Sequence, residues 1–483
     1  MKPIKYLLMS ALMIGFSTGA MAQDGTKADV EAVKNIIKSK PADVAKQMKA
    51  YYNKNKKNAE NLVAFGRAFF EAKDTANAAT YARYALAAAK NKCAPAYVLL
   101  GDVAAMGDDG GAAAQNYEQA IYADPKDPEA YYKYATVYRK IDPEGAVAKL
   151  EQLRQERPDY PVDALLGHIN YLSMRYGPAI QAFDRVPLSD LQRRDYVEYA
   201  FSGYLAKQYN KAIEVCKEGL KKEPVNATLN RLAMFCNTEV KNYEDALKYG
   251  DVLFNKVDKD SVNISEMDHL YHAKALIGVE RFDDAIAELQ KGLQIEAEDK
   301  SAHADLYKTL SDAYKAKKEF PDAIDNYRKF LDTTKDAEAT DWAGLGMLYM
   351  QYARVAPEEE RAAIYQLADK AFADLIEKFP DAEEYGLQQR GYANANADPK
   401  MEQGLAKPHF ERLIELILAH DEKTDVDNKR LIDCYRYLMS YYYQQKDVEK
   451  ALEYAQKQLE LTPDDQDLQN VVESLTKTVN LKK

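Results

Sequence analysis

The chain has 483 residues, of which 30% are charged, and its mean hydropathy of −0.54 argues against a protein embedded in a membrane. Its formal net charge of −11 argues against nucleic acid or an anionic membrane as a partner. A single globular core is not expected at this length, whereas an array of repeats has no such limit.

The first 22 residues predict a signal peptide. Lys2 and Lys5 precede an apolar stretch from Tyr6 to Phe16, and Ala20 and Ala22 supply the small residues of a cleavage site. We expect cleavage after Ala22 and export to the periplasm or envelope of a Gram-negative bacterium. The alternative is an uncleaved membrane anchor, for which the apolar run is short. No later segment has the run of about 20 apolar residues that a membrane span needs.

Residues 23–59 contain two helix-like stretches that are separated near Pro41. They match the pattern of the following residues only weakly. We therefore expect residues 23–59 to form N-terminal capping helices.

A pattern of small and aromatic residues returns about every 34 residues from Asn61 to Pro463. Its clearest copy contains Tyr97, Leu100, Gly101, Ala113, Tyr117, Ala120 and Pro125. The next copy contains Tyr131, Tyr134, Ala135, Tyr138, Ala146, Leu150 and Pro158, and further copies follow in the same register. Counted from a first copy around Phe65 and Gly66, there are about eleven.

This pattern resembles the signature of the tetratricopeptide repeat (TPR) family, W-x-x-L-G-x-x-Y…A-x-x-x-F…P, and the resemblance covers most of the chain. It implies an all-α fold, a TPR superhelical solenoid of about eleven helical hairpins with a C-terminal capping helix. We expect an N-terminal block of repeats over residues 60–258. A second block with longer inserts, one of them lengthening a hairpin turn at Arg354–Arg361, should cover residues 259–463. The capping helix should span residues 464–483.

The repeat positions have physical reasons. Small residues such as Gly66, Gly101 and Gly167 are expected where two helices approach closely, with aromatic rings filling the space beside them. Proline at the end of a unit stops the second helix because it has no amide hydrogen and restricts the residue before it. No hairpin can bury its apolar face alone, so neighbouring hairpins must stack.

The sequence contains no recognisable catalytic or cofactor-binding motif, which predicts a protein that is not an enzyme and has no cofactor. His269 and His272, one helical turn apart, come nearest to a metal site, but both fall on positions that normally pack, so no metal is expected. Among the four cysteines, Cys216 and Cys236 could form a disulfide, although two buried thiols are favoured.

The resemblance implies a non-enzymatic scaffold that binds a protein or an extended peptide in the concave groove of the solenoid. The basic clamp with which some TPR cochaperones hold acidic C-termini is not expected, because the groove positions, including Asp102, Thr136 and His168, show no basic cluster. The candidate groove residues instead form an apolar stripe on the first helices of the hairpins. They are Tyr132, Tyr171, Phe201, Tyr204, Phe235 and Tyr271.

A SusD-like glycan-binding or nutrient-binding protein of the outer membrane is the alternative, since such proteins also build on TPR helices. Two features argue against it. The predicted cleavage site is not followed by a lipoprotein cysteine, and a single Trp offers little for stacking on sugar rings.

The predicted leader can be tested directly on the native protein. Because Ala20-Met21-Ala22 suits signal peptidase, N-terminal sequencing should begin at Gln23. A mature protein that still begins at Met1 would contradict both the processing and the predicted compartment.

Overall fold

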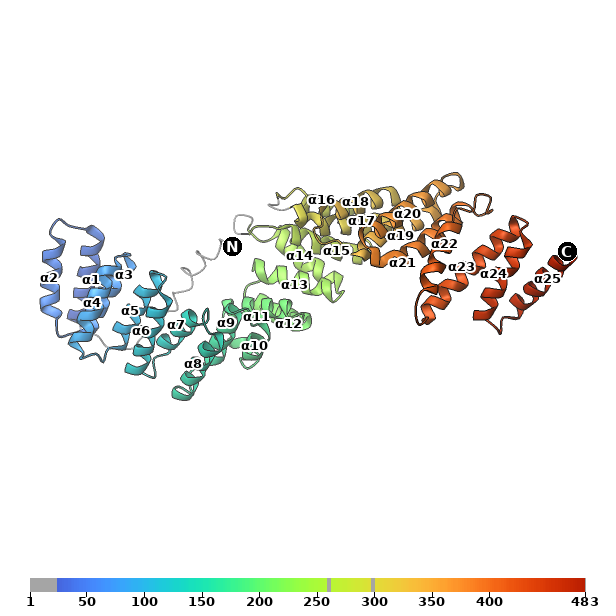
Figure 1. The fold of residues 1–483 in the computed structure, drawn as a ribbon. Coiled ribbons are helices and arrows are strands. Elements are labelled where there is room, and N and C mark those ends of the chain that lie inside the picture. The colour runs from blue at the N-terminus through green and yellow to red at the C-terminus, as the bar shows by residue number, and fades with distance from the viewer. Residues whose placement is uncertain (1–23, 259–261, 297–299, 483) are drawn as a thin grey trace. The chain divides into compact units, whose positions relative to one another are not determined.

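The computed structural model describes residues 24–258, 262–296 and 300–482, and the predicted signal peptide lies outside them. Every regular element in these ranges is a helix (Figure 1). None of the described helices combines the length and the apolar character that crossing a membrane requires. The helices form two compact units, and the boundary between Leu232 and Ala233 lies inside α13 (Ala227–Glu239).

Unit 1 precedes this boundary. It contains α1 (Asp24–Ser39), α2 (Val44–Asn55), α3 (Ala59–Glu71), α4 (Thr75–Ala88), α5 (Ala94–Met106), α6 (Gly110–Ala123), α7 (Pro128–Tyr138), α8 (Pro143–Glu156), α9 (Val162–Leu172), α10 (Tyr176–Phe183), the short 3-10 helix η2 (Leu188–Asp190), α11 (Arg193–Leu205) and α12 (Tyr209–Lys222).

Unit 2 follows the boundary. It contains α14 (Tyr243–Asn255), α15 (Glu266–Gly278), α16 (Phe282–Gly292), η3 (Lys300–His303), α17 (Ala304–Ala316), α18 (Phe320–Thr333), α19 (Ala339–Val355), α20 (Glu358–Lys378), η4 (Pro380–Ala382), α21 (Glu383–Ala397), α22 (Lys407–Leu418), α23 (Asp425–Gln444), α24 (Val448–Leu461) and α25 (Gln466–Lys482).

The described helices from α3/α4 to α23/α24 form eleven consecutive pairs, and α25 follows them. This confirms the predicted all-α solenoid of about eleven hairpins with a C-terminal capping helix. Five second helices end two residues before the proline that was expected to stop them. These prolines are Pro125, Pro158, Pro224, Pro380 and Pro463.

The insert at Arg354–Arg361 does not lengthen a hairpin turn as expected. It extends the helices instead, because α19 runs for 17 residues to Val355 and α20 begins at Glu358 and runs for 21. The buried Ala353 and Ala356 keep the chain packed through the turn. The acidic side chains that open α20 also suit the positive end of a helix dipole.

Eight of the eleven described hairpin turns share one backbone motif that the repeat pattern does not predict. After Phe70, for example, Lys73 adopts φ 61°, and the amide of Asp74 donates to the carbonyl of Phe69 over 2.9 Å. This is a Schellman ending with a residue other than glycine in the left-handed region. Seven further hairpin turns place a positive-φ residue in the same way: Asp108, Met174, Lys207, Lys241, Glu280, Lys318 and Lys446.

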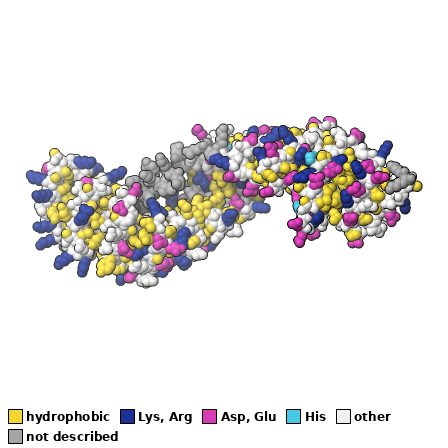
Figure 2. All heavy atoms as spheres, in the orientation of Figure 1, with side chains coloured by type: hydrophobic (Ala, Val, Ile, Leu, Met, Phe, Trp, Pro, Cys, Tyr) yellow, Lys and Arg dark blue, Asp and Glu magenta, His cyan; other side chains and the backbone are white. Residues whose placement is uncertain are grey.

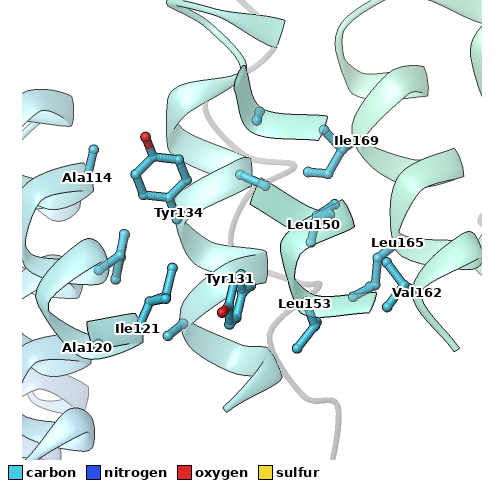
Figure 3. Packing of buried hydrophobic residues seen from close by; sticks show 14 of the residues in the cluster. Ala114, Ala120, Ile121, Tyr131, Tyr134, Leu150, Leu153, Val162, Leu165 and Ile169 are labelled. Atoms are coloured by element: carbon cyan, nitrogen blue, oxygen red, sulfur yellow. The ribbon is translucent and has the colours of Figure 1, made fainter. Parts of the chain in front are cut away.

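The core runs from hairpin to hairpin rather than being closed within each one. Figure 3 shows Tyr131 of α7 near Leu150 and Leu153 of α8, with Leu165 and Ile169 of the next hairpin on the other side. Tyr131, Leu150, Leu153 and Ile169 have no exposed surface. Each hairpin therefore needs its neighbours to cover the apolar side chains that it contributes to this core.

Within four hairpins, a glycine on the first helix makes room for an aromatic ring from the second. A Cβ atom added to Gly167 would lie 2.5 Å from the Phe183 ring, and one added to Gly346 would lie 2.5 Å from the Phe372 ring. The other two pairs are Gly101 with Tyr117 and Gly391 with Phe410. The space at the glycine is thus filled by a ring rather than by another backbone.

Additional helices cover both ends of the repeat array. At the start, Val33, Ile36 and Met48 of α1 and α2 are buried in the same cluster as Phe65 of α3. At the end, α25 buries Leu468, Leu475 and Val479 against α23 and α24, whereas Val471 remains 39% exposed.

The glycine sites yield a matched pair of stability predictions. Gly167→Ala should lower the free energy of unfolding by about 1–3 kcal/mol, because the added methyl group displaces the buried Phe183 ring. Gly177→Ala, in the same hairpin, should change it by less than about 1 kcal/mol, since a Cβ there meets nothing within 4 Å. Urea denaturation followed by circular dichroism measures both. Equal effects would show that the ring contact is unimportant.

Candidate functional site: the first-helix face

We use the name first-helix face for the surface formed in unit 1 by α5, α7, α9 and α11, the first helices of four successive hairpins. Neighbouring members of this series pack against each other. All six candidate residues lie on first helices: Tyr132 on α7, Tyr171 on α9, Phe201 and Tyr204 on α11, Phe235 on α13 and Tyr271 on α15.

Two candidate residues from neighbouring hairpins meet directly. The Tyr171 and Phe201 rings lie edge to face with centroids 6.1 Å apart, and both side chains are half-buried. Tyr176 of α10 adds a third ring 6.5 Å from Tyr171. Tyr204, also half-buried, instead lies 6.2 Å from Tyr209 in its own hairpin. The face therefore has an aromatic cluster that retains some exposed ring surface.

Tyr132 does not join this cluster, because it belongs to a polar network. Its hydroxyl lies 3.1 Å from Nε2 of His168, and Nδ1 of that ring lies 2.8 Å from both carboxylate oxygens of Glu198. Arg194 contacts the buried Asp195 at 3.0 Å. Burial by itself lowers the pKa of Arg194, but Asp195 and Glu198 outweigh burial and raise that pKa, so the guanidinium remains charged.

A second network lies at the start of the face. Lys133 donates to both carboxylate oxygens of Asp102 over 2.6 Å, and the Tyr117 hydroxyl donates to the same carboxylate over 2.8 Å. Glu129 lies 3.2 Å from the Lys133 ammonium. The side chains of Lys133 and Asp102 are only 10% and 11% exposed. The pair is therefore well shielded from water.

The face does carry basic side chains, which the sequence analysis missed. Lys133 and Arg194 lie outside the repeat positions, so the repeat pattern does not point to them. The i,i+4 spacing of Arg194 and Glu198 could have revealed one of them. In the structure each is paired with a carboxylate, so neither presents an uncompensated positive charge.

The two remaining candidates, Phe235 and Tyr271, pack on each other in unit 2. Their rings stack with centroids 4.2 Å apart, and only 7% and 6% of these residues are exposed. The Tyr271 hydroxyl donates to Glu239 over 2.7 Å. Little ring surface is left to contact a partner at this position.

His269 and His272 converge on Glu288 of α16. Nδ1 of His269 lies 2.8 Å from the Glu288 carboxylate, and Nδ1 of His272 lies 3.3 Å from it. Burial would raise the pKa of Glu288, but contacts from both histidines and Lys291 hold it well below its usual range. Across the part of the chain that the structure describes, neither this cluster nor any other group of three or more His, Cys, Asp or Glu side chains is arranged to hold a metal ion.

Three further features concern the possible disulfide, the single tryptophan and an open surface depression. Cys216 and Cys236 are both buried, and no disulfide joins them. Trp342 is half-buried, with the Lys378 ammonium 4.4 Å above its ring. An open depression of about 590 Å³ lies between the loop before α22, α23 and α25, and its lining includes Met439 and Tyr443.

No family model matches the chain, and no curated protein matches it either. Among solved structures, the C-terminal part of a TPR repeat-containing protein from Cytophaga hutchinsonii is 26% identical over 57% of this chain and 98% of its own, with a TM-score of 0.46. PilF from Pseudomonas aeruginosa is 17% identical over 41% of this chain and 89% of its own, with a TM-score of 0.33. A chain of the APC/C hetero-tetramer Cut9–Hcn1 is 13% identical over 93% of this chain and 81% of its own, with a TM-score of 0.31.

These TM-scores are all below 0.5, so the fold is assigned from the repeat positions and the helix pairs themselves. The described helices form the hairpins that the repeat predicts, with its small and aromatic positions in the core. The chain therefore has the fold of a tetratricopeptide repeat protein. Repeat proteins of this class use their extended concave surfaces for binding.

The Lys133–Asp102 pair predicts a large effect of a single substitution. Lys133→Met should lower the free energy of unfolding by about 2–4 kcal/mol, because it leaves the Asp102 carboxylate shielded from water without its cation. Lys140→Met, which removes an exposed lysine just after the same helix, should change it by less than about 0.5 kcal/mol. Thermal and urea denaturation measure both. A small effect at Lys133 would mean that water solvates Asp102.

Proposed function

We propose that this chain is a non-enzymatic protein-interaction scaffold, exported to the bacterial envelope, which binds an extended peptide segment on the first-helix face of unit 1. The observation that supports it most is the aromatic cluster of Tyr171 and Phe201, which joins two successive hairpins and remains half-buried rather than fully enclosed. Large amphipathic side chains of this kind supply most of the binding energy at peptide interfaces.

The burial pattern narrows the set of contact residues. Tyr132, Tyr171, Phe201 and Tyr204 keep part of their surface exposed, whereas Phe235 and Tyr271 are covered by each other. The proposed contact surface therefore consists of the first four residues. Because they come from three neighbouring hairpins, they suit an extended segment that crosses several hairpins better than a compact ligand.

The charges on the face indicate the chemistry of that segment. Lys133 is already bound to Asp102, and Arg194 to Asp195, so a segment rich in Asp and Glu would have to displace a carboxylate to reach either cation. Such a displacement is costly for shielded pairs. We therefore propose a segment that binds through apolar and aromatic side chains, with its backbone hydrogen-bonding to polar groups of the face.

The SusD-like alternative has less support. Sugar platforms need an open aromatic face, whereas the single tryptophan, Trp342, is half-buried below Lys378.

The combined variant Phe201→Ala and Tyr204→Ala tests the proposal. It should reduce capture of the native partner from envelope extracts at least about tenfold, because two large contact side chains are lost. Thermal denaturation of the same variant should show little change. Tyr122→Ala, which removes a tyrosine that is 84% exposed on the second helix α6, is the matched control and should capture the same protein as the unmodified chain.

Three other outcomes would each contradict the proposal. Unchanged capture by the double variant would exclude these residues from the contact surface. Equal loss in the Tyr122 variant would mean that capture does not depend on the first-helix face. Unfolding of the double variant would show that the two rings belong to the core.

A further inference from the structure

Charge is distributed very unevenly along the chain. Residues 23–92 contain 12 Lys and 2 Arg against 7 Asp and Glu, whereas residues 93–483 contain 50 Lys and Arg against 70 Asp and Glu. The net charge of −11 therefore conceals a strongly basic start. Because salt screens charges more than about 10 Å apart, the distant acidic residues do not cancel this local excess.

The basic side chains at this start are mostly unpaired. From Lys34 onward, ten of its lysines are exposed and have no carboxylate of the described residues within 4.0 Å: Lys34, Lys38, Lys40, Lys46, Lys49, Lys56, Lys57, Lys73, Lys90 and Lys92. Lys54 is an exception, since it contacts Asp29 at 2.7 Å. By contrast, Lys133 and Lys149, farther along unit 1, each contact a carboxylate.

Seven of the ten lysines lie on or beside α1 and α2. We call this group, Lys34, Lys38, Lys40, Lys46, Lys49, Lys56 and Lys57, the lysine end. Helix α2 directs Met48, Tyr51 and Asn55 toward α1 and α3. Lys46 and Lys49 lie on its opposite side, because each residue advances about 100° around a helix. Figure 2 shows the dark-blue side chains projecting outward at the α1–α2 end of unit 1, on the left.

We propose that the lysine end binds the headgroups of an anionic phospholipid bilayer. Its cations project from the outside of the unit, where a broad anionic surface can reach several of them at once. Lysine acts as a point charge that suits such a surface, whereas recognition of individual phosphates favours the arginine fork. The proposal is independent of the peptide-binding function proposed above.

Two other anionic partners fit less well. Single-stranded nucleic acid needs exposed aromatic rings for stacking, but the most exposed aromatic ring of α1–α4, Tyr84 at 38%, already packs on Tyr52 at 4.4 Å. An acidic peptide would be expected in the groove of a TPR array. The basic side chains Lys133 and Arg194 there are compensated, and the free charge lies elsewhere.

The outer side of α2 offers only small apolar groups for insertion, since Ala45 and Ala50 are exposed alongside the lysines. Binding is therefore electrostatic and reversible, and it weakens as salt screens the charges. The net charge of the whole chain, −11, argued against an anionic membrane as a partner, but the local charge of the lysine end favours one.

Vesicle sedimentation with residues 23–483 tests the proposal. The protein should bind vesicles containing about 30% phosphatidylglycerol at least about tenfold more tightly than pure phosphatidylcholine vesicles at about 0.05 M salt. Most of this binding should disappear at about 0.3 M salt. A variant with glutamine at Lys34, Lys38, Lys46, Lys49, Lys56 and Lys57 should lose at least about tenfold in affinity.

A control variant removes the same charge elsewhere, with glutamine at Lys217, Lys241, Lys318, Lys423, Lys429 and Lys446, which are also exposed and unpaired among the described residues. It should bind within about threefold of the unmodified chain, and circular dichroism should show both variants folded. Equal loss in both variants, or no binding by the unmodified chain, would overturn the proposal. So would tighter binding of a short single-stranded DNA or of polyglutamate at the same salt. The Phe201→Ala and Tyr204→Ala variant should bind vesicles normally.

Discussion

Close packing of the two helices within each hairpin governs how the hairpins can stack. Where Gly167 faces Phe183 and Gly346 faces Phe372, the missing side chain lets a fully buried ring occupy the space between two helices. This contact sets how closely the helices approach, and it leaves the outer side of each hairpin apolar. Stacking then follows, because only a neighbouring hairpin can cover that side.

The same stacking places the first helices next to one another and so creates the first-helix face. Residues about one repeat apart in the sequence become neighbours there, as Asp102 and Lys133 do, or His168 and Glu198. The resulting networks compensate the buried charges, and the cluster around Tyr171 and Phe201 remains the open apolar part of the face. Stability and recognition thus depend on the same inter-hairpin contacts.

At the lysine end, the lysines have no such carboxylate partners among the described residues, so their positive charge is not compensated. The hairpins of unit 1 surround Lys133 and Arg194 with carboxylates, whereas Lys46 and Lys49 lie on the outer side of α2 and contact no carboxylate of the described residues. A peptide-binding face and a basic end can therefore act separately in one unit. The total charge of the chain describes neither of them.

The helical repeat can be predicted from the sequence alone, because glycine, aromatic and proline positions act over a few residues, as at Gly101, Tyr117 and Pro125. It did not reveal that Lys73 takes the left-handed turn position usually given to glycine, or that Arg354–Arg361 extends two helices. It also placed Tyr132 and Phe235 in one stripe. The folded arrangement shows that Tyr132 bonds to His168 whereas Phe235 stacks on Tyr271, and the sequence could not predict this because a side chain's exposure depends on which neighbouring hairpin packs against it.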